Sequence, residues 1–238
     1  QLEDCAKTVK RVSMELGGHA PFIVFEDADI EAAIAGAIAA KYRNTGQTCV
    51  CANRIYVHQD IYEKFSEGFA KEARKLQTGQ GFDPSADQGP LIDEAALAKV
   101  EEHVADAKNH GGEVILGGHP HKLGGLFYEP TVIKNANDEM LLAHEETFGP
   151  VAPLFSFSTE EEVIERANNT PFGLASYFYT SDLAKSWRVS EQLEYGIVGL
   201  NTGIISTEMA PFGGIKESGT VSYTHLRAHE TLRYLVCR

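Results

Sequence analysis

Short apolar runs alternate with amphipathic helical segments along most of this chain, and this alternation restricts the fold more than any other feature. The predicted strands are rich in β-branched and aromatic residues and lie at residues 20–25, 54–57, 113–116, 128–133, 151–157, 176–179 and 196–201. The predicted helices run from residue 30 to a stop near 44–46, from 61 to 73, and over 93–109, 159–168 and 183–193. This order predicts an α/β fold, a mainly parallel sheet with flanking helices.

The charge and cysteine content exclude several classes of protein. The net charge of −13 argues against nucleic-acid and anionic-membrane partners, because both carry negative charge. No apolar run approaches the roughly 20 residues that span a bilayer, and residues 1–5 lack the basic and apolar regions of a signal peptide. The four cysteines are too few and too scattered for a disulfide scaffold, so we expect a cytoplasmic protein.

The chain changes character at residue 220. From there to residue 238 the acidic balance disappears and three arginines appear without a clear periodicity. We interpret residues 220–238 as a non-native tail of the kind that translated adapter sequence produces. The alternative is a genuine, divergent C-terminal helix. No function is assigned to His225, His229 or Cys237.

A candidate nucleophile follows a glycine turn. Cys49 comes after Gly46-Gln-Thr, near a position where a helix could begin. A helix dipole and nearby backbone N–H groups lower the pKa of a thiol and favour the nucleophilic thiolate. The alternative is that Cys49 is a small buried apolar residue, which is common for an isolated cysteine.

A candidate base precedes a pair of glycines. Glu15 lies at the end of a predicted strand and is followed by Leu16, Gly17 and Gly18. Two successive glycines let another group approach the backbone closely. The alternative is a structural carboxylate before a turn.

Four motifs in order carry a resemblance to the aldehyde dehydrogenase superfamily. They are Met-Glu-Leu-Gly-Gly-His-Ala-Pro at 14–21, Asn-Thr-Gly-Gln-Thr-Cys at 44–49, Glu-Glu-Thr-Phe-Gly-Pro-Val at 145–151 and Pro-Phe-Gly-Gly-Ile-Lys-Glu-Ser-Gly at 211–219. The resemblance covers roughly residues 1–219. It implies that the fold is the Rossmann-like catalytic domain of that family.

The resemblance also assigns roles. Cys49 would attack the aldehyde as a thiolate, and the thiohemiacetal would pass a hydride to NAD or NADP to leave a thioester. Glu15 would activate the water that hydrolyses the thioester, so its pKa should be raised. The backbone N–H of Cys49 would help to bind the oxyanion. Leu16, Glu146 and Phe148 would contact the cofactor, although simple core packing is an alternative for Phe148.

The segments that contain Arg43 and Ser206 resemble the succinate-semialdehyde dehydrogenase branch of the superfamily. There, Arg43 and Ser206 would hold the distal carboxylate of the substrate, because a guanidinium offers a fork of donors to a carboxylate. The alternative for Arg43 is a structural ion pair at a helix end. Glutarate semialdehyde and uncharged aldehydes are rival substrates. The Cys-x-Cys spacing also suggests that Cys51 could form an oxidative disulfide with Cys49.

The resemblance also implies how the chain divides into domains and which parts of the family's structure it lacks. Residues 1–17 would hold the last strand of a truncated cofactor-binding domain, 18–219 the catalytic domain and 220–238 the non-native tail. No glycine-rich phosphate loop follows a strand. We expect the chain as written to be inactive and the parent enzyme to be a homo-oligomer, a dimer or tetramer, acting on a small aldehyde.

Other interpretations have less support. A cofactor-independent thioesterase or acyltransferase and a non-catalytic relative are the alternative classes of protein. No Cys or His pair stands at zinc-ligand spacing, so no metal site is predicted. His103 and His110 are expected to be solvated on or near a helix, His119 and His121 to lie in a loop, and Trp187 to be a core or interface side chain.

Overall fold

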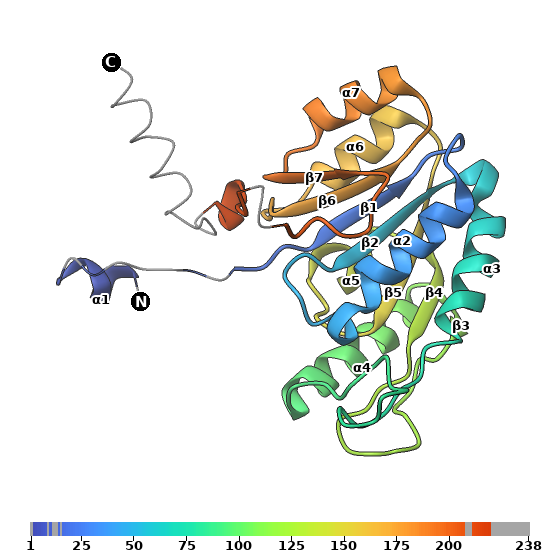
Figure 1. Ribbon diagram of the computed structural model, residues 1–238, viewed down its shortest axis with the longest axis vertical. Helices are drawn as coiled ribbons and strands as arrows, with labels where there is room; N and C mark the ends of the chain where they lie inside the picture. The colour runs from blue at the N-terminus through green and yellow to red at the C-terminus, as the bar shows by residue number, and fades with distance from the viewer. Residues whose placement is uncertain (1, 9, 11–13, 15, 208–210, 220–238) are drawn as a thin grey trace.

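The chain folds around one seven-stranded sheet with the order β3-β4-β5-β2-β1-β6-β7 (Figure 1). The computed structural model describes residues 2–8, 10, 14, 16–207 and 211–219. The strands are β1 (Ala20–Val24), β2 (Ala52–His58), β3 (Glu113–Leu116), β4 (Thr131–Ala136), β5 (Val151–Phe157), β6 (Ala175–Tyr179) and β7 (Ile197–Leu200). All neighbouring strands pair in parallel except β3 and β4, which are antiparallel. The predicted α/β fold class is therefore confirmed.

The five longer helices begin and end close to the predicted positions, and two short helices occur in addition. The helices are α1 (Leu2–Ala6), α2 (Ile30–Tyr42), α3 (Tyr62–Ala73), α4 (Glu94–Asn109), α5 (Leu141–His144), α6 (Glu160–Asn168) and α7 (Leu183–Gln192). Short 3-10 helices occur at η1 (Arg43–Gly46), η2 (Gln59–Ile61) and η3 (Lys216–Ser218). The caps of four helices use a side chain that accepts backbone N–H groups, namely Asp29, Asp93, Thr159 and Asp182.

The sheet is covered on both faces, and each face has its own core cluster. Alternate residues of β1 and of the position after it show this directly. Phe22 and Val24 pack with α2 and α3, while Ile23 and Phe25 pack with α4, α5, α6 and α7. The inner strands β1, β5 and β6 are buried almost throughout, which explains why they are nearly continuous apolar runs rather than alternating ones.

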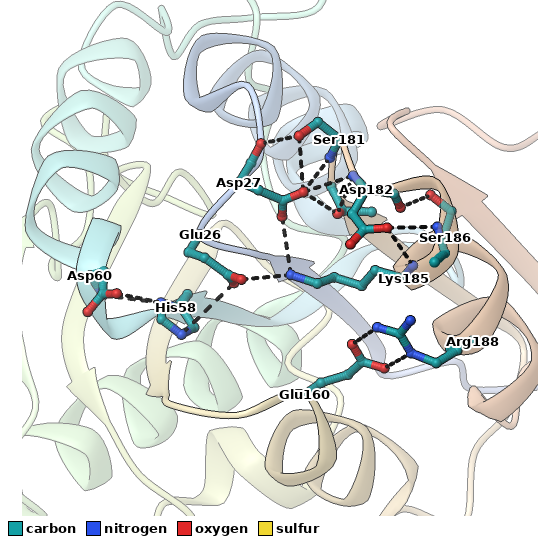
Figure 2. A network of polar contacts seen from close by, with 12 residues as sticks. Glu26, Asp27, His58, Asp60, Glu160, Ser181, Asp182, Lys185, Ser186 and Arg188 are labelled. Carbon is teal, nitrogen blue, oxygen red and sulfur yellow. Dashed lines mark hydrogen bonds and ion pairs between the residues drawn. The ribbon is translucent and has the colours of Figure 1, made fainter.

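An ionic cluster fixes the carboxyl end of β1. Figure 2 shows the Asp27 carboxylate facing the turn that leads into α7. It accepts hydrogen bonds from the Thr180 hydroxyl at 2.7 Å and from the backbone N–H groups of Ser181 and Asp182, each at 2.9 Å. The Lys185 ammonium lies 3.3 Å from Asp27 and 2.8 Å from Glu26. This Asp27 cluster ties the chain before α2 to the start of α7.

Several smaller predictions were wrong or lie outside the described residues. His103 is fully buried, because it shares the inner face of α4 with Val100, Val104 and Ala107. Trp187 is not in the core of this chain, since 67% of it is exposed, and its alternative role as an interface side chain stays a prediction. Helices α1 and α5 were not predicted. The strand expected near residues 10–15 falls mostly on undescribed residues, as does the tail at 220–238. No described helix has the length and apolarity to span a membrane.

Candidate active site

The candidate nucleophile lies in a turn between α2 and β2, at the amino-terminal end of the parallel strands. Asn44, Thr45 and Gly46 all adopt the left-handed conformation, with φ values of 50°, 58° and 75°. A Cβ on Gly46 would overlap the carbonyl oxygen of Gly149, so the turn requires glycine there. Cys49 then leads directly into strand β2, which begins at Ala52. A helix does not begin after Cys49, so the predicted helix-dipole effect on its thiol is wrong.

Side chains of the turn hold it against the loop at residues 89–92. The Thr45 hydroxyl accepts the Gly89 N–H at 3.0 Å. The Gln47 side chain donates to the Pro90 carbonyl at 3.2 Å and accepts the Ile92 N–H at 2.9 Å. These bonds occupy the polar groups of the predicted Asn-Thr-Gly-Gln-Thr-Cys motif and fix the position from which Cys49 enters the site.

The predicted diglycine turn packs against the Cys49 turn. A Cβ on Gly18 would overlap the Cys49 carbonyl oxygen, and a Cβ on Gly17 would lie 3.1 Å from the Glu146 carboxylate. The Ser218 hydroxyl donates to the Gly17 carbonyl at 2.6 Å. The first and fourth motifs, which are far apart in the sequence, are therefore in direct contact.

One cavity joins the predicted nucleophile to the three predicted cofactor-binding residues. It has a volume of about 380 Å³ and is lined by Leu16, Gly17, Gln47, Thr48, Cys49, Glu146 and Phe148. Phe148 has a left-handed backbone (φ 55°) and is 38% exposed, so it is not a core side chain. The structure thus places the predicted cofactor residues Leu16, Glu146 and Phe148 beside the predicted nucleophile.

Glu146 is the half-buried carboxylate of this cavity. It accepts the Gly18 N–H at 3.3 Å. Burial raises the pKa of its carboxyl group above the ordinary value, against the lowering effects of the Gly18 and His19 N–H groups and of Lys99 and Lys41. Glu15, for which the sequence predicts a raised pKa, lies outside the described residues, so its role stays a prediction.

Arg43 and Ser206 are both exposed, and no contact between them is present among the described residues. Arg43 follows α2 at the start of the Cys49 turn. The charges of both Arg43 and Cys49 act on the Tyr177 hydroxyl, which donates to the Val50 carbonyl at 2.7 Å. Arg43 therefore acts on a tyrosine that bonds the backbone one residue after Cys49, whereas Ser206 has no described link to this segment.

Cys51 points into the protein interior. Its side chain is fully buried, and burial raises the pKa of its thiol. The Lys41 ammonium donates to the Cys51 sulfur at 3.4 Å. The proposed oxidative partnership of Cys51 with Cys49 stays a prediction. Among the described residues no cluster of His, Cys, Asp and Glu could hold a metal ion.

Two buried cations near the site were not predicted. Arg54 is 1% exposed and donates to the carbonyl groups of His19, Arg166 and Ala167 and to the Tyr195 hydroxyl. Arg54 thus holds the backbone just after the diglycine turn. Lys41 is fully buried. Its spacing of four residues from Ala37 places it on the inner face of α2, a signal that sequence periodicity could have given.

The geometry defines an α/β protein whose candidate site brings a cysteine, a glutamate and a diglycine turn together. The model of the aldehyde dehydrogenase family matches residues 2–235, and the chain belongs to that family. A 3-sulfolactaldehyde dehydrogenase of Pseudomonas putida is 60% identical over 215 residues, which are 90% of this chain and 44% of the relative. A mitochondrial succinate-semialdehyde dehydrogenase of Oryza sativa subsp. japonica is 60% identical over 214 residues, 90% of this chain and 41% of that protein.

A solved structure has the same fold. The crystal structure of an Escherichia coli NADP-dependent enzyme superposes with a TM-score of 0.89 at 57% identity, covering 92% of this chain and 45% of the other. The chain therefore spans less than half the length of the relatives that it matches.

Proposed function

We propose that the parent protein of this chain oxidises an aldehyde with a distal anionic group to the corresponding acid, with NAD or NADP as the oxidant. Succinate semialdehyde is the leading substrate. The observation that carries this proposal is the single cavity that joins Cys49 to Leu16, Glu146 and Phe148. Family membership supplies the type of reaction.

Cys49 is the proposed nucleophile. Its thiolate attacks the aldehyde carbon to form a thiohemiacetal, and its own backbone N–H helps to bind the oxyanion. Loss of hydride leaves a thioester on the sulfur. Glu15 removes a proton from the water that hydrolyses this thioester, which releases the acid and restores the thiol.

The residues of the cavity fit the nicotinamide end of a dinucleotide. Leu16 and Phe148 offer apolar surface, and the Glu146 carboxylate can accept a hydrogen bond from a ribose hydroxyl. The nicotinamide, when bound, supplies the acceptor for the hydride. Glu146 is already held by the Gly18 N–H at 3.3 Å, so its carboxylate is oriented by the protein itself.

A distal anion on the substrate is supported by Arg43 and by the relatives. Arg43 is exposed and acts on the tyrosine that bonds the backbone one residue after Cys49, and a guanidinium binds carboxylate or sulfonate oxygens through paired N–H groups. The two relatives at 60% identity are named for one sulfonated and one carboxylated aldehyde. Ser206 is proposed as a second ligand of this anion. Glutarate semialdehyde remains a rival substrate.

The test is an initial-rate assay of the full-length parent protein that follows formation of the reduced nicotinamide. Succinate semialdehyde is compared with butanal, which has the same chain length without a carboxylate, and Cys49→Ala is the control. A strong preference for the charged aldehyde that disappears in the control supports the proposal. Equal rates with the two aldehydes would support the dehydrogenase activity but contradict the preference for an anionic substrate. Absence of nicotinamide binding would favour a thioesterase or acyltransferase.

The proposal also covers the cellular location, the oligomeric state of the parent protein and the activity of the 238-residue chain. A cytoplasmic location rests on the cysteine content, and a homo-oligomeric parent and an inactive 238-residue chain rest on the family resemblance. Size-exclusion chromatography of the parent and the same rate assay on the 238-residue chain test the last two.

A further inference from the structure

The buried ammonium of Lys41 lies beneath the segment that carries the candidate nucleophile. Lys41 belongs to the last turn of α2, and its side chain donates to the Cys51 sulfur at 3.4 Å and to the Asn53 side-chain oxygen at 3.2 Å. Cys51 and Asn53 follow Cys49 closely along the chain, at the start of β2. The ammonium therefore ties the end of α2 to the strand that begins after the nucleophile.

The two groups that accept hydrogen bonds from the Lys41 ammonium, the Cys51 thiol and the Asn53 amide oxygen, are neutral. No ion pair of Lys41 is present in the part of the chain that the structure describes, although the residue is fully buried. An isolated buried charge is costly, since protein interiors solvate ions poorly. The positive charge of Lys41 is therefore only weakly screened, and it acts on groups several ångströms away.

The titratable groups around Lys41 show which neighbours can respond to its charge. Burial raises the pKa values of Tyr42 on α2, Cys51 before β2 and Tyr177 on β6, so these groups are neutral at pH 7. Burial lowers the pKa of His19 to about 3, so it is neutral as well. The carboxyl group that faces this region is Glu146, and the charge of Lys41 lowers its pKa.

The remaining charged neighbours are mostly cations. Arg54 lies beside His19, Arg43 acts on Tyr177 from the surface, and Lys99 acts on Glu146. Lys99 is paired at the surface with the Glu145 carboxylate, 3.8 Å away. Lys41 and Arg54 are thus the buried cations of this region for which the described residues supply no paired carboxylate. A thiolate at Cys49 and the oxyanion that forms there would be the complementary negative charges.

We propose that Lys41 is a positioning residue whose buried positive charge stabilises negative charge at Cys49, and so keeps the nucleophile in its reactive form near neutral pH. The proposal rests on the proposed function in so far as Cys49 is the nucleophile. The competing explanation is that Lys41 only pins α2 to β2.

The test measures the rate at which iodoacetamide alkylates Cys49 in the 238-residue chain between pH 5 and pH 10. Cys49 and Cys51 lie in the same proteolytic peptide, so tandem mass spectrometry, which assigns the alkyl group to one residue of that peptide, separates this reaction from any reaction of Cys51. In Lys41→Met the midpoint of the pH profile should rise by about one pH unit, since a nearby cation favours the thiolate. A folded Lys41→Met chain with the wild-type midpoint would overturn the proposal.

A second variant keeps the lysine and neutralises its charge. Asn53→Asp places a carboxylate where the amide oxygen now lies 3.2 Å from the ammonium, so the hydrogen bond is retained and a buried ion pair forms. It should raise the midpoint in the same direction. If Lys41→Met does not fold, this variant decides the question, and an unchanged midpoint in Asn53→Asp counts against the role of charge.

The matched control is Lys185→Met. Lys185 is also a nearly buried lysine, 8% exposed, but it is paired with Glu26 and Asp27 at the opposite end of the sheet. It should lower stability and leave the midpoint unchanged. An equal shift in this control would show that general destabilisation moves the profile. Alkylation needs neither nicotinamide nor aldehyde, so this test and the proposed dehydrogenase activity can fail separately.

Discussion

The α-carbon of Gly18 packs directly against the carbonyl oxygen of Cys49, and a side chain at Gly18 would occupy the space of that oxygen. The two residues belong to different motifs and lie at the starts of the adjacent parallel strands β1 and β2. The position of the nucleophile therefore depends on the absence of a Cβ at Gly18.

Gly18→Ala should displace the Cys49 turn. We expect the catalytic rate constant of the full-length protein to fall about 100-fold, because small displacements of a reacting group have effects of this size. The control is Gly81→Ala, since no atom lies within 4 Å of a Cβ built at Gly81. Steady-state kinetics of both variants checks the prediction, and a fully active Gly18→Ala protein would contradict it.

Arg43→Gln should separate charged from uncharged substrates. Loss of a bidentate charged hydrogen bond should reduce kcat/KM for succinate semialdehyde by roughly 10- to 100-fold, and the value for butanal should stay unchanged. Arg74→Gln is the matched control, because Arg74 is an exposed arginine at the end of α3. Equal losses for both aldehydes would indicate that Arg43 is structural.

Asp27→Asn should weaken the fold in a pH-dependent way. Bonds from Thr180 and Ser181 and the charge of Lys185 lower the pKa of Asp27, despite the opposing effect of burial. A lowered carboxyl pKa in the folded state contributes stability above the unfolded pKa, near 4, and this contribution is lost as the pH falls further. The variant should lose roughly 2 kcal/mol of unfolding free energy at pH 7.

Urea unfolding at pH 7 and at pH 3.5 measures this difference for Asp27→Asn. The cost of the substitution should be smaller at pH 3.5, because the wild-type carboxylate then begins to lose its advantage. Glu72→Gln, which breaks an exposed pair with Lys75, should cost under about 0.5 kcal/mol at either pH. A cost for Asp27→Asn that is small at pH 7 would contradict the prediction.

His19 should make the fold sensitive to mild acid. Burial and the charge of Arg54 lower its pKa to about 3, whereas the unfolded value is near 6.5. A histidine that stays neutral in the fold contributes stability above pH 6.5, and that stability falls as the pH drops towards 3. His19→Asn removes this titration. The loss of unfolding free energy that the substitution causes should therefore be up to about 2 kcal/mol smaller at pH 5 than at pH 7.

Chemical denaturation of the wild type and of His19→Asn at these two pH values provides the check. His103, whose pKa burial also lowers, titrates in both proteins and cancels in the comparison. A cost that does not change with pH would mean that His19 is not held neutral by the fold.

The sequence predicted the long helices well because their apolar residues recur with a regular period, and the strands because most are short, nearly continuous apolar runs. It predicted a helix start after Cys49 from a glycine turn, but a turn into a strand has the same local composition. It placed His103 in solvent because histidine is polar, although its spacing from Val100 and Val104 puts it inside. The degree of burial of His103 was predicted from its residue type, whereas its position on the helix would have given the correct result.

The site was predicted through its motifs, and what could not be predicted is how those motifs meet. Gly18 against Cys49 and Ser218 on Gly17 are contacts between segments distant in the sequence. Buried Arg54 was missed because its partners are neutral groups of distant segments that no local pattern identifies. Buried Lys41 was missed because lysine is polar, although its spacing from Ala37 puts it on the inner face of α2. The interior charge of the site is thus a property of the packed fold.

The order of the site segments along the chain also has a consequence for biogenesis. A ribosome releases the Cys49 turn well before it makes Glu146 and Phe148, which line one cavity with Cys49 in the finished fold, and Ser218, which bonds the adjacent diglycine turn. Until those segments arrive, the thiol belongs to an incomplete sheet that lacks its strands β5 and β6. A nascent or truncated chain therefore carries an unshielded cysteine, and rapid completion of the sheet protects it from chemical damage.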